Sequence, residues 1–482
     1  MKSPLLALLL APAFAAPAAP LAPEIEVTVQ DAGTLKRVVD RNAWMADFSG
    51  TNLYRGTMVR LGPVFFALGR KGEDAWDGRL VDWIVARLLE GRPARLSYFG
   101  APGLASPFGV TLPALTAPQR ESARLLLESL RSGPDVPVEA ILAGVAKKTV
   151  TVTPVRVKAQ KLAAVAAESC LVVSRDPSVA AALSLRCARP GEKNAATAPS
   201  AARLDVDLSQ LVPAASIVRE KLLGVGPRLS VGFDFEPREA RFVPSAAEVP
   251  VAGGHLLREA PLDDALVGAL PAGTVFLASV TVPDPGPLDA EALGTWIRTV
   301  REKPPAGTRT VAVASLGTRR VGGEDEPLTA LLLRDRGETE AGVRSLFSRG
   351  GTWVVEVSRA CKGLLVASPS PTAVREIEAA CSGKAPSLRQ LPAPLLSRLT
   401  TGSASGSVYL NGGRLLASAL ELGWARQTRG EAAPPEVASA LGLLDRLPAW
   451  ALAGRAEGSM LKMRAATWSP AAPAPKKGGR TP

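Results

Sequence analysis

The chain has 482 residues, of which 57 are Lys or Arg, 45 are Asp or Glu, four are Cys and only one is His, and its formal net charge is +12. A chain of this length buries at least one ordinary hydrophobic core and often forms two domains. A single histidine excludes His-cluster zinc sites and iron facial triads, because these sites need two or three imidazoles.

The amino-terminal segment has the pattern of a secretory signal peptide. Lys2 precedes an apolar run from Leu5 to Ala11, and the triplet Ala13-Phe14-Ala15 follows. This pattern predicts a signal peptide over residues 1–15, cleaved after Ala15. The alternative is a buried Ala- and Leu-rich helix, but several nearby prolines would break it. No later stretch reaches the roughly 18 apolar residues of a membrane span. We therefore expect a periplasmic or secreted protein without a transmembrane helix in the mature chain.

The positive charge is spread thinly along the chain, apart from a Pro-, Ala-, Gly- and Lys-rich segment at residues 469–482 that we expect to be a disordered basic tail. The sequence shows no dense Lys/Arg stripe and no basic residues interleaved with aromatic ones, as in single-strand binders. We expect no nucleic-acid partner. An envelope component such as anionic lipid or a cell-wall polymer is the expected partner class.

A similar series of patterns occurs twice. A cysteine, an apolar strand, a Ser-x-x-Pro turn and an Ala-rich helix that ends in another cysteine follow one another from Cys170 to Cys187 and again from Cys361 to Cys381. Trp83 and Trp296 each lie in a helical pattern upstream and are expected to be buried. Asp207 and Asn411 are expected to cap helices downstream. The alternative is two unrelated segments that share their cysteine spacing.

Each half is also expected to end in a hairpin, at residues 228–243 and 450–468. These patterns predict an α+β fold of two homologous repeats, each a mainly antiparallel sheet with packed helices. The expected segments are a first repeat over 24–245, a linker over 246–261 and a second repeat over 262–468. A dinucleotide-binding fold is not expected, since the alternating strand–helix series with a Gly-rich first turn is missing.

The four cysteines are an even number in a chain predicted to be exported, which favours disulfide bonds. Because each half carries one pair, the predicted bonds are Cys170–Cys187 and Cys361–Cys381. Each is expected to contribute about 3 kcal/mol in the chain-entropy picture. Free buried thiols are the alternative. Neither pair forms a Cys-x-x-Cys motif, so a redox-active dithiol is not expected.

No catalytic motif in the sequence is complete. The only histidine, His255, lies beside two glycines and is expected to be an exposed loop residue. Residues 402–406 place their serines away from the centre of a Gly-x-Ser-x-Gly elbow. Ser459 and Lys462 form a Ser-x-x-Lys pair, but in a predicted hairpin rather than at a helix start. The acidic run at residues 322–326 lacks the alternation of a calcium loop. We expect no catalytic residue, no metal site and no cofactor.

Residues 270–274 (Leu-Pro-Ala-Gly-Thr), the strand–turn–helix at 364–374 and the closing hairpin at 453–465 resemble an exported bacterial family of unknown function. The resemblance covers mostly residues 262–468. It implies repeated strand–helix units and supplies no catalytic residue.

Three hypotheses for function follow. The first is a non-catalytic envelope protein that acts as a binding or scaffolding module. The second is a carrier of an apolar ligand such as a lipid, and the third is a hydrolase.

Overall fold

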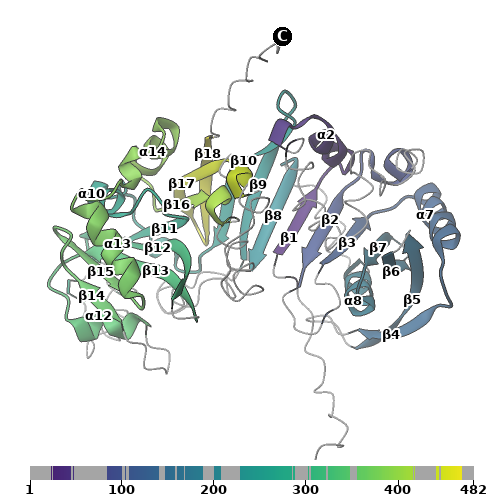
Figure 1. Cartoon of the computed structure of the whole chain (residues 1–482), viewed down its shortest axis with the longest axis horizontal. Helices are drawn as coiled ribbons and strands as arrows, with labels where there is room; N and C mark the ends of the chain where they lie inside the picture. Colours follow the sequence, from purple (N-terminus) through teal and green to yellow (C-terminus); the bar gives the residue numbers. More distant parts are fainter. Residues whose placement is uncertain are drawn as a thin grey trace, which may run out of the picture. The chain divides into compact units, whose positions relative to one another are not determined.

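The structure is a computed structural model of the whole chain (Figure 1). The residues that it describes are 23, 25–44, 47, 84–99, 104, 108–140, 147–157, 160–167, 169–187, 200–207, 228–284, 286–287, 302, 305–321, 324–347, 355–415, 417, 441–444 and 447–468. Several predicted features lie outside these residues: the signal peptide, the basic tail, Trp83 and Trp296. The helix predicted to follow Asp207 lies outside them as well.

The chain divides into two compact units. Unit 1 comprises Met1–Gly33, Met58–Leu68 and Gly72–Ala198, and unit 2 comprises Thr34–Thr57, Gly69–Lys71 and Pro199–Pro482. The division thus falls after Ala198, whereas the linker predicted from the sequence lies at 246–261. Residues of that predicted linker belong to strand β10 (Arg241–Pro250) and to the short helix η5 (Gly254–Leu256) of unit 2.

Unit 1 contains an antiparallel sheet in the order β1-β2-β3-β7-β6-β5-β4. Its strands are β1 (Ile25–Val29), β2 (Ala94–Tyr98), β3 (Phe108–Pro113), β4 (Val136–Ala140), β5 (Lys148–Val157), β6 (Gln160–Ala166) and β7 (Cys170–Ser174). Helix α8 (Pro177–Cys187) packs with Val172 and Ala163 of the sheet in one apolar cluster. Helix α7 (Ala117–Leu130) and the short helix η1 (Val85–Leu89) pack in a second cluster, with Leu171 and Ala164. Neighbouring strand residues point to opposite faces, so the two clusters lie on the two faces of the sheet.

Unit 2 contains an antiparallel sheet in the order β8-β9-β10-β18-β17-β16-β11-β12-β13-β15-β14. Its other strands are β8 (Ala202–Asp207), β9 (Arg228–Glu236), β11 (Phe276–Pro283), β12 (Thr308–Val321), β13 (Glu324–Arg334), β14 (Glu356–Ser358), β15 (Leu364–Ser368), β16 (Gly406–Asn411), β17 (Ala449–Glu457) and β18 (Met460–Trp468). Its named helices are α2 (Gly33–Arg41, which starts at the last residue of unit 1), η5, α10 (Asp264–Ala269), α12 (Glu340–Phe347), α13 (Pro371–Cys381), η6 (Leu388–Gln390) and α14 (Ala393–Thr400).

The helices α10, α13 and α14 cover one face of the unit 2 sheet. Leu277, Ala312 and Tyr409 of the sheet are buried in one cluster with Leu266 of α10 and Leu395 of α14. Leu277 lies opposite both Ala314 and Tyr409 in the strand register, so these side chains share a face. The alternation of fully buried with half-buried residues along β11 and β12 follows from this arrangement, because every second side chain faces the helices.

The fold class predicted from the sequence, α+β with two homologous repeats, is wrong. The described residues are dominated by strand, with 45% strand against 29% helix, and all 18 strands pair antiparallel in extended sheets. The hairpin β9–β10 does not close a separate module, since β10 pairs with β18 at Ala247↔Met463 and Val249↔Leu461 (Figure 1). The physical reason is that a hairpin edge leaves free backbone N–H and C=O groups, which two edges satisfy by pairing with each other.

Several local predictions are confirmed. The hairpins form as β9–β10 and β17–β18, and the second turns at Gly458, which adopts a positive φ of 60°. Asn411 caps the short helix after β16, since its side-chain oxygen accepts a hydrogen bond of 3.1 Å from the amide of Arg414. In the part of the chain that the structure describes, no helix has both the length and the apolar character to cross a membrane.

Candidate functional site

Both predicted disulfide bonds are present. Cys170 is bonded to Cys187 and joins β7 to the end of α8, and Cys361 is bonded to Cys381 and joins the β14–β15 loop to the end of α13. Neither bond closes a redox motif of the Cys-x-x-Cys type. The cysteines therefore anchor helices to sheets, one pair in each unit.

The residues of the incomplete catalytic motifs do not form a site. His255 is exposed on η5, as predicted. Ser459 lies at the β17–β18 turn, and the Lys462 ammonium pairs with the Glu457 carboxylate at 2.7 Å across this hairpin. Among the described residues, no group of three or more His, Cys, Asp or Glu side chains is placed to hold a metal ion.

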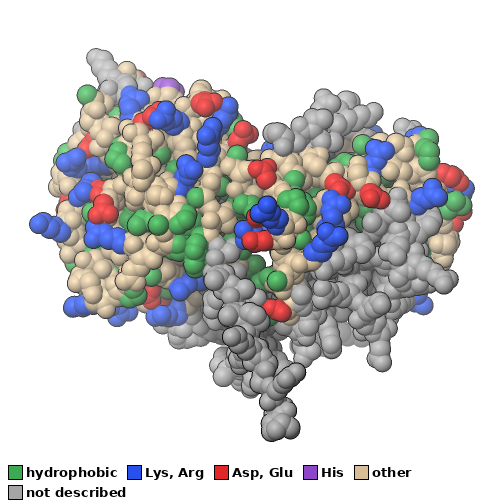
Figure 2. All heavy atoms as spheres, turned by 90° about the horizontal axis from the view of Figure 1, so that it is seen from above, with side chains coloured by type: hydrophobic (Ala, Val, Ile, Leu, Met, Phe, Trp, Pro, Cys, Tyr) green, Lys and Arg blue, Asp and Glu red, His purple; other side chains and the backbone are tan. Residues whose placement is uncertain are grey.

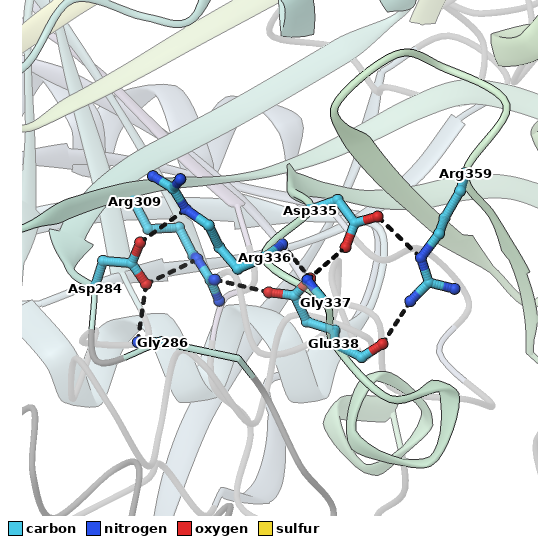
Figure 3. Close-up of polar contacts among 8 residues, drawn as sticks. All are labelled: Asp284, Gly286, Arg309, Asp335, Arg336, Gly337, Glu338 and Arg359. Atoms are coloured by element: carbon cyan, nitrogen blue, oxygen red, sulfur yellow. Dashed lines mark hydrogen bonds and ion pairs between the residues drawn. The ribbon is translucent and has the colours of Figure 1, made fainter.

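Six charged residues of unit 2 form a connected polar arrangement, which we call the ionic hub (Figure 3). Its members are three carboxylates and three guanidiniums, those of Asp284, Asp335, Glu338, Arg309, Arg336 and Arg359. They come from the end of β11, the start of β12, the β13–α12 connection and the loop after β14. The hub thus joins segments that lie far apart in the sequence.

Two Asp-x-Gly turns position hub carboxylates. The amide of Gly337 donates to Asp335 Oδ1 at 2.9 Å, and the amide of Gly286 donates to Asp284 Oδ1 at 3.2 Å. Both glycines have a positive φ, 87° at Gly337 and 101° at Gly286, which residues with a Cβ rarely adopt. An Asp side chain that bonds its own backbone two residues on is typical of such turns. Each strand end therefore presents a carboxylate in a fixed orientation.

Arg309 is the centre of the hub. Its residue surface is only 2% exposed, its Nη2 lies 2.7 Å from Glu338 Oε1, and its Nε lies 3.3 Å from Asp284 Oδ1. These contacts are ion pairs without hydrogen-bond alignment, since the N–H groups do not point at the oxygens. Arg336 Nε reaches the other oxygen of Asp284 at 3.1 Å. The Arg309 charge is therefore removed from water and compensated by two carboxylates.

Arg359 completes the hub from the opposite side. Its Nε donates to Asp335 Oδ2 at 2.9 Å, and its Nη2 donates to the main-chain oxygen of Glu338. The amide of Arg336 in turn donates to Glu338 Oε2 at 2.8 Å. Each carboxylate of the hub thus faces a guanidinium of the hub, and the six charges sum to zero. Balanced networks of this kind fix the positions of loops.

The pKa of the Asp335 carboxyl reflects this environment. Burial acts to raise its pKa, but the Gly337 amide, the contact with Glu338 and the Arg359 guanidinium outweigh burial and hold the pKa below its ordinary value. A lowered folded-state pKa stabilises the fold above the unfolded pKa of about 3.9 and loses this effect as pH falls through the folded pKa. The hub is therefore expected to weaken in acid.

A pH prediction follows for Asp335→Asn. The free energy of unfolding of the wild type is expected to fall more between about pH 7 and about pH 3 than that of the variant, because the variant has no carboxylate to protonate at this position. Chemical denaturation at both pH values measures the difference. Asp264→Asn, in the exposed Asp264–Arg389 pair, is the matched control. Equal acid losses in the wild type and D335N would contradict the prediction.

Unit 1 contains a separate buried carboxylate. Glu26 of β1 is 4% exposed and accepts hydrogen bonds from both terminal nitrogens of Arg186 on α8, one of them at 3.2 Å. The Ser97 hydroxyl also donates to it at 3.2 Å, and Arg95 Nε lies 3.4 Å away. This arrangement ties α8 to the sheet and is again fully engaged in ion pairs.

The second face of the unit 2 sheet carries an apolar cluster that has both buried and half-buried members. Val280 lies opposite Val311, and Val408 lies opposite Leu452, so these side chains share the face turned away from Leu277 and Tyr409. They belong to a cluster that crosses the sheet, of which the half-buried members are Leu204, Leu229, Phe233, Val280, Val311, Val313, Val357, Val408, Trp450, Ala456 and Ala465. We call this the apolar face.

Comparison with protein-family models, with curated proteins and with solved structures found no match to this chain. The resemblance to an exported bacterial family remains a prediction. On the face drawn in Figure 2, Lys and Arg side chains of the described residues are scattered among Asp and Glu rather than gathered in one patch. This distribution agrees with the thinly spread charge of the sequence.

Proposed function

We propose that the chain is an exported, non-catalytic cell-envelope protein that binds an envelope component through the apolar face of unit 2. The observation that carries this proposal is the row of half-buried apolar side chains across the sheet, which includes Val280, Val311, Val313 and Val408. Apolar surface of this kind gains free energy when a partner covers it. The two disulfide bonds support export, since such bonds persist in oxidising compartments.

A carrier of an apolar ligand such as a lipid is the second candidate. On the apolar face, the Trp450 ring meets Phe233 of β9 at 5.8 Å, edge to face. Trp450 Nε1 and the hydroxyl of Thr467, which lies opposite it, are both shielded from solvent and have no hydrogen-bond partner. Unpaired polar atoms cost free energy when they are buried. A mostly apolar ligand with one polar group would relieve this cost if the surrounding side chains move apart and let it reach these atoms.

The hydrolase hypothesis ranks third. Each hub carboxylate is engaged with a guanidinium, and a general base needs a lone pair free to accept a proton. The hub therefore supports a structural role.

The two leading candidates are tested with a photo-crosslinking residue at Val311 of the full mature chain, expressed in an envelope-containing host. A binding module is expected to crosslink to one defined envelope component, and Val408→Asp is expected to abolish the product. A carrier is expected instead to copurify with lipid that mass spectrometry detects and that Val408→Asp releases. A crosslinker at Leu125 of α7, which is 51% exposed, is the matched control. Equal labelling at both positions, with no bound lipid, would refute a binding role for the apolar face.

A further inference from the structure

The disulfide bonds lie beside arginines that hold carboxylates. In unit 2, Cys361 follows Arg359 by two residues, and the Arg359 guanidinium binds Asp335 at 2.9 Å. In unit 1, Cys187 directly follows Arg186, whose guanidinium donates hydrogen bonds to the buried Glu26 carboxylate. In both units, a half-cystine therefore lies within two residues of the arginine.

The loop of residues 359–363 makes this relation specific in unit 2. On one side, Arg359 contacts Asp335 and the main chain of Glu338, and the carbonyl of Gly363 accepts a hydrogen bond of 3.1 Å from the Asp335 amide. On the other side, Cys361 is buried and bonded to Cys381, the last residue of α13. The loop thus lies between the ionic hub and a covalent tether to a packed helix.

We propose that the Cys361–Cys381 bond and the Arg359–Asp335 ion pair are coupled, so that the ionic hub is more stable in the oxidised chain than in the reduced chain. An untethered loop must lose conformational entropy to hold Arg359 in place, and the covalent tether removes much of this cost. Coupling between two equilibria is reciprocal. The ion pair must therefore favour formation of the disulfide by the same factor by which the disulfide favours the ion pair.

The maturation step is a thiol–disulfide exchange. The two thiols lose two protons and two electrons, the Cys361–Cys381 bond forms, and an external disulfide donor takes up the electrons and protons and leaves as a dithiol. The reverse reaction with a dithiol reductant starts at Cys381, which is only half-buried, whereas Cys361 is buried. The hub is therefore expected to gain stability when the chain reaches an oxidising compartment.

The test uses Arg359→Met in the full chain with both disulfides formed. The chain is equilibrated with mixtures of reduced and oxidised dithiothreitol, and alkylation followed by peptide mass spectrometry gives the reduced fraction of each cysteine pair. Cys361–Cys381 is expected to be half reduced at a ratio of reduced to oxidised reagent about fivefold lower than in the wild type. Cys170–Cys187 of the same molecule lies in unit 1 and is expected to be unchanged.

Two control variants and one hydrogen-exchange measurement test the coupling further. Arg344→Met, which removes an exposed ion pair with Glu340 in the same unit, is expected to shift neither disulfide. Arg359→Lys is expected to restore part of the wild-type value, because it keeps the charge. The amides of residues 335–338 are expected to exchange hydrogen faster in Cys361→Ser/Cys381→Ser than in the wild type, with the β16–β18 region unchanged. An unshifted Cys361–Cys381 equilibrium in R359M, or an equal shift of both disulfides, would overturn the proposal.

Discussion

Arg309→Met is expected to destabilise the protein by about 3 to 5 kcal/mol, because it leaves the carboxylate of Glu338 buried without its guanidinium. The cost arises from the unpaired charge that remains rather than from the lost attraction, since Glu338 has almost no contact with water. Chemical denaturation monitored by circular dichroism measures the free energy of unfolding. Arg344→Met, in an exposed ion pair, is the control and is expected to cost less than about 1 kcal/mol.

The double variant Arg309→Met/Glu338→Met separates the two contributions. It removes both buried charges together, while Asp284 keeps its partner Arg336. The double variant is therefore expected to be more stable than R309M by at least about 1 kcal/mol. A loss below about 1 kcal/mol for R309M, or a double variant less stable than R309M, would show that the hub charges are solvated in the native state.

Gly454→Ala is expected to destabilise the protein by about 3 kcal/mol through overpacking of the sheet. A Cβ at this position would lie 1.8 Å from the main-chain oxygen of Lys462 and 2.5 Å from Cα of Met463, both on the neighbouring strand β18. These are backbone atoms in a paired ladder, so they can move only if the β17–β18 pairing distorts. The midpoint of thermal unfolding is expected to fall accordingly.

Gly442→Ala is the matched control for the same substitution. A Cβ there has no heavy atom within 4 Å, and residues 441–444 are helical. Alanine is favoured over glycine in a helix by up to about 1 kcal/mol, so this variant is expected to be unchanged or slightly stabilised. A G454A protein as stable as G442A would show that the two strands lie farther apart than the structure indicates.

The features predicted correctly from the sequence are local ones. The Cys170–Cys187 and Cys361–Cys381 bonds each span a short segment, and the β17–β18 hairpin turns within a few residues. Turn chemistry and side-chain periodicity in neighbouring residues determine such features. The continuity of the unit 2 sheet depends instead on pairing between β10 and β18, for which no local pattern exists. This is why the predicted fold class of two homologous repeats is wrong.

The ionic hub was missed for a related reason. Its charges come from four separate segments, and only the Asp-x-Gly pattern after an apolar strand, seen at Asp284 and Asp335, is visible in the sequence. A charged residue inside a strand, such as Arg309, is usually exposed. Its burial depends on carboxylates that the fold brings to it from β11 and from the β13–α12 connection. The sequence alone does not show that Arg309 lies close to Asp284 and Glu338.

The pairing of β10 with β18 also determines the order in which unit 2 can form. Residues 246–250 pair with residues 460–464, more than 200 positions later in the chain. During synthesis from the amino terminus, the edge of β10 stays unpaired until the β17–β18 hairpin has been made. Contacts so distant in sequence slow folding, and an open strand edge in the meantime can pair with another chain. Truncation before β17 removes the strands that lie between β10 and β16, so it divides the sheet into two open pieces.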